Sequence, residues 1–267
     1  FINEIHYDNA STDSGEGIEI AGLAGTDLTG MSLVPYNGSN GTSYSITALT
    51  GIIPDQEGGF GTLWFAISGL QNGAPDGVAL VAADGTTVLQ FLSYEGAFEA
   101  TNGPAIGITS TDIGVAETSS TPVGESLQLV GSGFRYEDFT WQDAATSSNA
   151  AVNSGQSFVA PAPFINEIHY DNSGADSDEG VEIAGLAGLD LTGMSLVPYN
   201  GSNGTTYSVT ALSGVIPNQQ GGFGTLWFAI SGLQNGAPDG VALVAADGAV
   251  LQFLSYEGEF AATNGPA

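Results

Sequence analysis

The chain has 267 residues, including 40 glycines and no cysteine, and sets 29 Asp and Glu residues against one basic residue, Arg135, for a net charge of −28. One basic side chain cannot displace phosphate counterions or bind anionic lipids, so nucleic-acid and membrane-surface partners are excluded. The lack of cysteine excludes disulfides and thiol chemistry, and no apolar run approaches the ~20 residues that a membrane-spanning helix needs.

Short strands separated by turns are expected from the first residue onward. Phe1, Asn3, Ile5 and Tyr7 alternate with Ile2, Glu4 and His6, which is the period of a β-strand. Further strands are expected at Glu16–Ile20, Ser32–Tyr36, Ser43–Ala48, Thr62–Ile67, Val78–Ala83, Thr87–Tyr94, Ser126–Val130, Phe139–Trp141 and Gln156–Val159. Turns rich in Gly, Asn and Asp separate them, and no segment has a helical period with start and stop signals. The pattern predicts an all-β chain of antiparallel β-sandwiches.

A long tandem repeat organises the chain. Residues Phe1–Ala105 recur as Phe164–Ala267 with about 15 substitutions and one deletion, a period of 163 residues that matches a whole domain. We expect a complete sandwich at residues 1–158, a Pro/Ala linker at residues 159–163, and a second copy at residues 164–267 that lacks its C-terminal strands. Two interpretations stay open: the natural protein continues past Ala267, or a neighbouring subunit supplies the missing strands. The start at Phe1, without an initiator Met, suggests a processed product or an excerpt.

The order of motifs resembles a known family. The run "FINEIHYDN…EGIEIAGLAGTDLTGMSLVPYNG…NGAPDGVALV…SLQLVGSG…FTW…NSGQSF" is similar to the bacterial lamin-tail-type domain, across Phe1–Phe158 and most of the second copy. The family usually has an aromatic residue at Gly17 and Gly180 and a tryptophan at Met31 and Met194, which we take as core-facing positions. The resemblance implies tandem immunoglobulin-like sandwiches. It also implies a non-catalytic attachment of secreted or surface proteins, which sometimes lies beside nucleases.

An acidic loop follows the first strand in each copy and is a candidate calcium site. Calcium takes six to eight oxygen ligands, often from carboxylates and carbonyls of one loop. The segment Asp176–Gly180 (DSDEG) resembles part of an EF-hand loop but lacks its closing glutamate. The alternative is a solvated acidic turn. The candidate ligands are Glu4, Asp8, Asn9, Asp13 and Glu16 in the first copy and Glu167, Asp171, Asn172, Asp176, Asp178 and Glu179 in the second.

No arrangement of residues predicts catalysis. The two histidines, His6 and His169, occupy the same strand position in the two copies, and one histidine per copy falls short of a zinc site. There is no G-x-S-x-G elbow, and the Gly58–Thr62 cluster lacks the lysine of a phosphate-binding loop. We therefore expect that the protein is not an enzyme.

Four asparagines that precede glycine match the N-glycosylation sequon, namely Asn37, Asn40, Asn200 and Asn203, and Asn9 matches it as well. Their Asn-Gly pairs are equally well explained by hairpin turns.

These observations favour a structural repeat module of a bacterial extracellular fibre, sheath or surface stalk whose partners are copies of itself, in a homopolymer or a longer array. Exposed sheet edges recruit further strands, which would join such modules. One alternative is a calcium-dependent adhesion or glycan-binding module, with Ca²⁺ as its cofactor and a glycan as its ligand. Another is an accessory domain of a secreted hydrolase.

Overall fold

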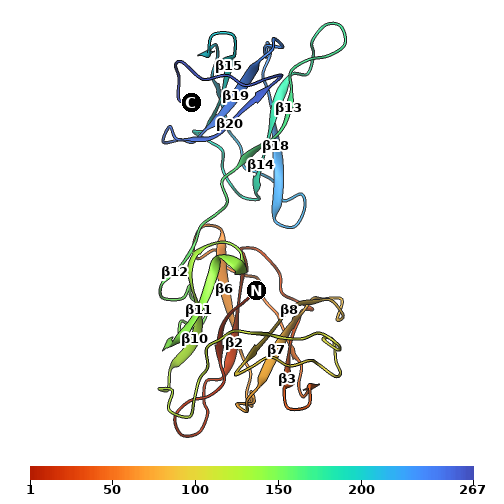
Figure 1. The fold of residues 1–267 in the computed structure, drawn as a ribbon, viewed down its shortest axis with the longest axis vertical. Helices are drawn as coiled ribbons and strands as arrows, with labels where there is room; N and C mark the ends of the chain where they lie inside the picture. The colour runs from red at the N-terminus through yellow and green to blue at the C-terminus, as the bar shows by residue number, and fades with distance from the viewer. The chain divides into compact units, whose positions relative to one another are not determined.

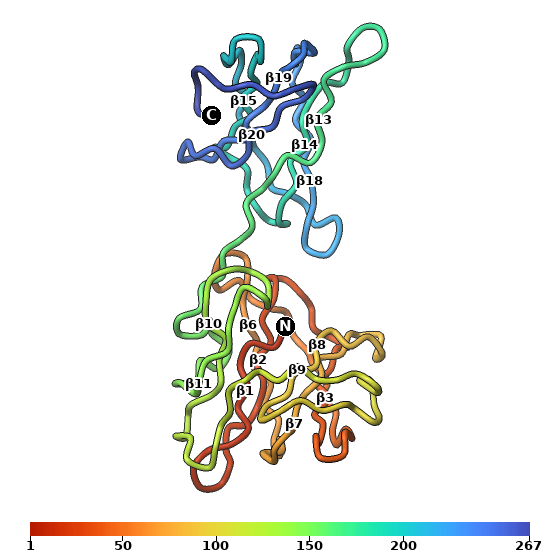
Figure 2. Tube along the Cα trace, viewed as in Figure 1, coloured from red at the N-terminus to blue at the C-terminus, as the bar shows by residue number.

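The computed structural model describes residues 1–267, and the chain divides into two compact units, Phe1–Ala160 (unit 1) and Pro161–Ala267 (unit 2). Each unit consists of β-strands joined by turns (Figure 1), and the Cα trace can be followed through each in Figure 2. The boundary falls inside the stretch 159–163 that the sequence suggests as a linker. The helical content is one 3-10 turn, η1 (Tyr136–Asp138), and no helix is long and apolar enough to cross a membrane.

The first sheet of unit 1 has its N-terminal strand in the middle. It consists of β1 (Ile2–His6), β2 (Gly17–Leu23), β6 (Phe60–Ala66), β10 (Glu125–Gly133), β11 (Phe139–Thr146) and β12 (Gln156–Phe158). The order is β11-β10-β1-β2-β6, and β12 pairs with β10. All pairings are antiparallel except β10 with β12. Both edges of β1 are therefore hydrogen-bonded, to β2 on one side and to β10 on the other.

The second sheet of unit 1 lies against the first. It consists of β3 (Ser32–Asn37), β4 (Thr42–Ser43), β5 (Thr47–Ala48), β7 (Asp76–Val81), β8 (Val88–Tyr94) and β9 (Thr111–Asp112). The order is β4-β3-β7-β8-β9, with β5 paired to β3 and only β9 running parallel to its neighbour. The turns between these strands place glycines where positive φ is needed, as at Gly41 and Gly85.

The core of unit 1 lies between the two sheets. The first sheet contributes Ile2, Ile5, Tyr7, Ile18 and Ile20, and the second contributes Leu33, Val78, Leu80, Leu92 and Tyr94. The rings of Tyr7 and Tyr94 stack with centroids 3.7 Å apart. The expectation of uninterrupted alternation along the first strand is wrong, because the pairing with β2 shifts register between Ile2 and Glu4. That shift lets Ile2 and Ile5 both face the core although they are three residues apart.

Unit 2 repeats the second sheet but only half of the first. The strands β15 (Ser195–Asn200), β16 (Thr205–Thr206), β17 (Thr210–Ala211), β19 (Asp239–Val244) and β20 (Val250–Tyr256) reproduce the second sheet except for β9, in the order β16-β15-β19-β20 with β17 on β15. The other sheet is β13-β14-β18, formed by Phe164–His169, Gly180–Leu186 and Phe223–Ala229. This sheet ends at β13, the counterpart of the central strand β1.

The prediction of an all-β chain with antiparallel sheets is confirmed, and two strand predictions need correction. Ser43–Ala48 is not one strand: the chain leaves the sheet between β4 and β5, where Ile46 is exposed. The short strand β9 was not expected, since Thr111–Asp112 carries no strand pattern. The immunoglobulin-like classification stays a prediction.

Gly17 was expected to face the core, and in the structure it faces away from it. A Cβ atom there would lie 2.5 Å from the Trp64 ring, which covers the glycine on the opposite side of the sheet from Ile18. Gly180 is covered by Trp227 in the same way. Met31 and Met194, in contrast, are half-buried against the two cores, as expected.

Candidate functional site

The part of unit 1 without a counterpart in unit 2 is Ile106–Phe158, here called the closing segment. Its strand β10 pairs with β1, with Gln128 opposite Glu4 and Leu127 opposite Ile5. Residues 147–158 then cross the face of β1, β2 and β6 that is turned away from the core, here called the outer face. On this face Glu4 lies opposite Glu19, and Glu19 lies opposite Trp64. The closing segment therefore extends the sheet at its edge and also covers one of its faces.

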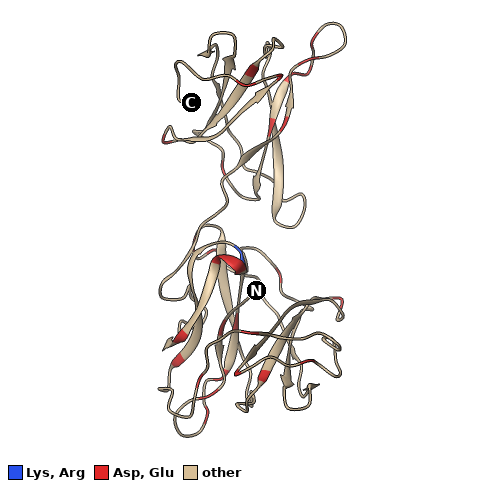
Figure 3. Cartoon of the chain, viewed as in Figure 1, with Lys and Arg blue, Asp and Glu red and all other residues tan.

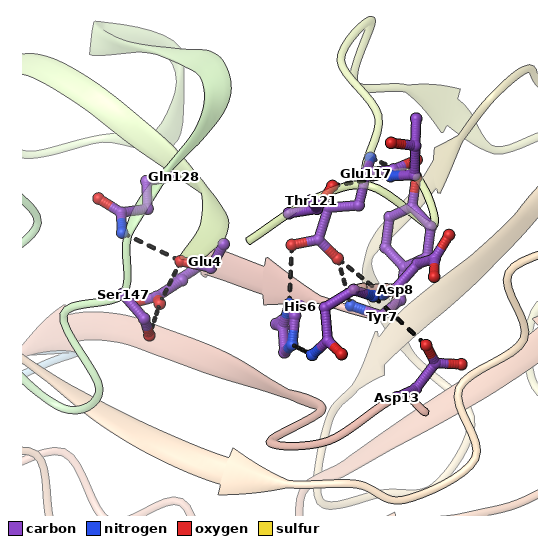
Figure 4. A network of polar contacts seen from close by, with 12 residues as sticks. Glu4, His6, Tyr7, Asp8, Asp13, Glu117, Thr121, Gln128 and Ser147 are labelled. Atoms are coloured by element: carbon purple, nitrogen blue, oxygen red, sulfur yellow. Dashed lines mark hydrogen bonds and ion pairs between the residues drawn. The ribbon is translucent and has the colours of Figure 1, made fainter. Parts of the chain in front are cut away.

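Glu4 is fully buried beneath the closing segment without a cation (Figure 4). Its Oε1 accepts hydrogen bonds from the hydroxyls of Ser126 and Ser147, and its Oε2 accepts one from Ser148, each at 2.5 Å. Gln128 in turn donates to the Ser126 hydroxyl at 3.0 Å. Because an unpaired buried carboxylate is costly, these three donors are what make burial of Glu4 tolerable.

Glu19 is the second buried carboxylate of the outer face. Its Oε1 accepts from Asn3 Nδ2 at 2.9 Å, and its Oε2 accepts from the backbone N–H of Ala150 at 2.6 Å. Burial raises the pKa of Glu19 to about 7, the nearby charge of Glu4 adds to the increase, and the hydrogen bonds oppose it. Asn3 also exchanges two hydrogen bonds with Gln156, at 2.7 and 3.1 Å. The closing segment thus supplies donors to both glutamates.

A third buried carboxylate, Glu117, belongs to the closing segment itself and ties it to β1 (Figure 4). Glu117 Oε1 lies 2.8 Å from Nδ1 of His6, and Oε2 accepts from the backbone N–H groups of Tyr7 and Asp8 at 2.6 and 2.8 Å. Burial lowers the pKa of His6, but the hydrogen bond and charge of Glu117 outweigh it, so the pKa stands above its ordinary value of 6.5. The contact with Glu117 therefore favours the protonated form of the first histidine.

Aromatic rings complete the contact at the other end of the outer face. The Phe158 ring stacks on Phe60 with centroids 5.5 Å apart and meets Phe139 edge-on at 5.6 Å. Phe1 lies 5.9 Å from Phe139 and 6.0 Å from Tyr136. Glu57 accepts from the Ser157 hydroxyl and the backbone N–H of Phe158. This aromatic cluster contributes apolar burial beside the polar network.

Unit 2 carries the same outer-face residues without a covering segment. Asn166 and Glu167, the counterparts of the buried Asn3 and Glu4, are exposed, and Glu182 is half-buried. Phe223 is 42% exposed, whereas its counterpart Phe60 is 3% exposed. A groove of about 480 Å³ lies beside it, lined by Phe164, Ala184, Gly185, Gln219, Gln220, Phe223, Gly224 and Thr225. The groove occupies the position that Phe158 fills in unit 1.

The candidate calcium ligands of unit 1 are brought together only in part. Asp8 and Asp13 are neighbours: burial raises the pKa of Asp8, and the charge of Asp13 raises it further. The backbone N–H of Asn9 donates to Asp13 Oδ1, and buried Asn9 Oδ1 has no hydrogen-bond partner. Glu4 lies instead in the serine network, and Glu16 accepts from the backbone N–H of Gly69. Across the chain, no group of three or more His, Cys, Asp and Glu side chains is placed to hold a metal ion.

The corresponding loop of unit 2 is similar. Asn235 Nδ2 donates to Asp176 Oδ2 at 3.3 Å and lies 3.5 Å from Asp171 Oδ1, so these two carboxylates are close together. Asn172 donates to His169 through its amide nitrogen and to Asp176 through its backbone N–H. Glu167 lies on the outer face, Glu179 accepts from the backbone of Gly232, and Asp178 is exposed with a φ of 58°. Calcium binding therefore stays a prediction, and Asp171 and Asp176 are the two candidate ligands of unit 2 that lie close together.

The four sequon asparagines that precede glycine lie in hairpin turns. Asn37 and Asn200 each donate their side-chain nitrogen to a glutamine, Gln71 and Gln234, and are half-buried. Asn40 and Asn203 are exposed, and each uses its side-chain oxygen to accept from the threonine two residues later. Turn geometry accounts for all four, and only the second pair leaves the amide nitrogen free of a partner within the chain.

Acidic residues are distributed over the strand ends and loops of both units, and Arg135 stands beside η1 (Figure 3). Arg135 is exposed, with its guanidinium 4.9 Å from the ring centroid of Phe134. Among Glu4, Glu19 and Glu117, only Glu117 bonds to a side chain that can be cationic, His6. Hydroxyl, amide and backbone N–H donors satisfy Glu4 and Glu19, whereas one oxygen each of buried Asp76 and Asp239 has no hydrogen-bond partner.

The sequence did not reveal the residues that matter most in this contact: Glu19, Glu117, Ser126, Ser147, Ser148, Gln156 and Phe158. A usable signal existed, since Glu4 and Glu19 sit in strands between apolar residues, where an acidic side chain needs a partner. The identity of that partner depends on residues more than 100 positions away.

Comparisons with known proteins do not assign the chain to a family. No protein-family model and no curated protein matches the chain. A crystal structure of a DUF3823 family protein from Bacteroides ovatus is similar at 10% identity and a TM-score of 0.21, over 96% of this chain and 97% of that one. So low a score carries no argument about fold or function.

Proposed function

We propose that the protein is a structural repeat module of a bacterial extracellular fibre, sheath or surface stalk. The observation that carries this proposal is the tandem repetition of two nearly identical β-units, each folded around its own core. A whole domain repeated along a chain is typical of an array of modules. The resemblance to lamin-tail-type domains supports the same class, since such domains are non-catalytic modules of secreted and surface proteins.

The chemistry of the units supports a building role. The histidine and the buried glutamates of unit 1 bond to other residues of the same unit: His6 pairs with Glu117, and Glu4 and Glu19 accept hydrogen bonds from the closing segment. The surface is acidic and carries one exposed arginine, which favours solubility outside the cell.

Localisation of the native protein tests the proposal. Antibodies raised against the chain should label filaments or the surface of intact, unpermeabilised cells that produce it. Labelling that appears only after permeabilisation would contradict an extracellular structural role. A matched antibody against a cytoplasmic protein controls for leakage.

A calcium-dependent adhesion or glycan-binding module is the second candidate, favoured by the adjacent carboxylates Asp8 and Asp13 and by Asp171 and Asp176. Calcium would relieve the repulsion between each pair of carboxylates. Light scattering and a glycan panel, each recorded in millimolar calcium and again after chelation, test this candidate. Glycan binding that chelation abolishes would favour this candidate over the structural role. Glycan binding, or a particle size in light scattering, that chelation leaves unchanged would contradict it.

A further inference from the structure

We propose that the pocket around Asp76 binds an organic cation, an ammonium or guanidinium group that a ligand brings from outside the chain. The pocket has a volume of about 300 Å³ and is lined by Asn37, Ser39 and residues 71–76. Unit 2 carries the same residues around Asp239. This inference goes beyond the proposed function, because it assigns a binding site to each unit whatever the units assemble into.

Asp76 is a buried carboxylate that uses only one of its two oxygens. It is the first residue of β7 and is 2% exposed. Its Oδ1 accepts a hydrogen bond at 2.9 Å from the backbone N–H of Gly38, the residue after β3, whereas its Oδ2 is buried without a hydrogen-bond partner. The link between the two strands therefore accounts for Oδ1 alone. Oδ2 remains an unsatisfied acceptor, which is costly unless a donor or a cation reaches it.

Oδ2 points toward Gly73, an exposed residue of the pocket wall. A Cβ atom on Gly73 would lie 3.4 Å from Oδ2, so the missing side chain leaves space directly beside this oxygen. The backbone of Gly73 does not have a positive φ, so the conformation itself does not require glycine. Unit 2 repeats the geometry: a Cβ on Gly236 would lie 3.3 Å from Oδ2 of Asp239, which is also buried without a partner.

The surroundings of the pocket favour a positively charged ligand. Burial raises the pKa of Asp76, the backbone N–H groups beside it oppose the increase, and the charge of Glu95 adds to it. Asn72 in the pocket wall donates to Asp13 Oδ2 at 3.3 Å, so a further carboxylate lies next to the loop. The chain has no lysine, and the guanidinium of Arg135 lies on the ring of Phe134. A cation for this acidic region must therefore come from another molecule.

A metal ion fits this pocket less well than an organic cation. Calcium takes six to eight oxygen ligands, commonly from several carboxylates, and the pocket is lined by one carboxylate residue. Two of its amide oxygens already accept hydrogen bonds: Asn37 Oδ1 from the backbone N–H of Ser39, and Gln71 Oε1 from the amide of Asn37. Ammonium and guanidinium groups carry several N–H donors, which can satisfy Oδ2 and share these amide oxygens at the same time.

Titration of the isotope-labelled 267-residue chain, followed by NMR, tests the proposal. The probes are N-acetyl-arginine amide and N-acetyl-lysine amide, and the backbone N–H signals of Gly38 and Gly73 report on the pocket of unit 1, those of Gly201 and Gly236 on that of unit 2. We expect saturable shifts in both pockets. N-acetyl-citrulline amide has nearly the shape of the arginine probe without its charge and should bind at least about tenfold more weakly at equal ionic strength. Propylguanidinium distinguishes the sources: affinity equal to that of the arginine probe indicates a small-molecule cation, and weaker affinity indicates a polypeptide side chain.

Matched substitutions locate the site within unit 1, and the pocket of unit 2 serves as the internal control. Asp76→Asn removes the charge and should weaken binding in unit 1 at least about tenfold. Gly73→Ala keeps the charge, places a methyl group at ordinary contact distance from Oδ2, and should weaken binding similarly. Glu99→Gln removes an exposed charge of the same unit and should leave the affinity unchanged.

Four results would overturn the proposal. They are an absence of saturable shifts, equal affinity for the citrulline and arginine probes, affinity that neither Asp76→Asn nor Gly73→Ala changes, and shifts of these signals with calcium chloride but with neither cationic probe.

Discussion

Glu19 makes the stability of unit 1 depend on pH in a way that a single substitution removes. Its pKa is about 7 in the folded unit, against 4.5 for an ordinary glutamate, chiefly because the closing segment buries it. Between these two pH values the folded protein holds a proton that the unfolded chain has released, so the stability falls as the pH rises from 4.5 to 7. The penalty is complete above pH 7. Since one pKa unit corresponds to ~1.4 kcal/mol, the full loss is about 3 kcal/mol.

Glu19→Gln should abolish this loss. Urea unfolding at pH 5 and pH 8, followed by tryptophan fluorescence in a Trp227→Phe background, reports on unit 1 through Trp64 and Trp141. The parent should lose about 2–3 kcal/mol more than the variant over this range, since a small part of the loss has occurred by pH 5. His6 contributes a slope of the same sign, because its raised pKa gives stability that is present below pH 6.5 and lost as the pH rises through the folded value. The test is therefore the difference between parent and variant.

The repeat provides the control for this measurement. Glu182→Gln changes the corresponding residue of unit 2, which is half-buried and has no closing segment over it. It should leave the pH dependence of unit 1 unaltered. Equal pH slopes in the parent and in Glu19→Gln would refute the reasoning, because they would show that Glu19 is not buried as an acid beneath residues 147–158.

Three further changes probe the same molecule. Glu117→Ala should destabilise unit 1 by about 3–5 kcal/mol, since it leaves His6 and two backbone N–H groups without their acceptor, and a shift of the urea midpoint measures it. Phe158→Ala should cost about 3–5 kcal/mol and uncover Phe60, with increased binding of a hydrophobic dye; an unchanged midpoint would contradict the packing. The calcium proposal predicts that Asp13→Asn weakens Ca²⁺ binding by unit 1 about tenfold in titration calorimetry, and equal heats for parent and variant would contradict it.

The contact between the closing segment and the rest of unit 1 buries three glutamates with one histidine as the only nearby cation. Neutral donors can stabilise carboxylates, but they do so only when each is placed within hydrogen-bonding distance of an oxygen. Such a contact is selective, because a segment without those donors would leave buried charge unsatisfied. The contact is also more stable at low pH, since protonation of a buried glutamate removes part of the free-energy cost of its burial.

The strands could largely be predicted, because apolar residues recur at period two and Asn-Gly turns interrupt them. The failures have local physical causes. The register shift after Ile2 interrupts the two-residue period, and no residue type at this position indicates it. The chain leaves the sheet within Ser43–Ala48 although the composition of this segment suits a strand. The calcium ligands were expected to gather because they are close in sequence, yet Glu4 and Glu16 turn to other partners.

The sequence alone determined that this protein is an acidic, cysteine-free chain of two nearly identical β-rich units, since composition, turns and a 163-residue repeat are read directly from it. Only the tertiary structure decided what Glu4, Glu19 and His6 do, because each has a partner far along the chain: Ser126, Ala150 and Glu117, respectively. The same residues in unit 2 have nearly identical neighbours in sequence and a different environment in space. Burial and hydrogen bonding depend on which segment lies across the sheet, and local sequence does not contain that information.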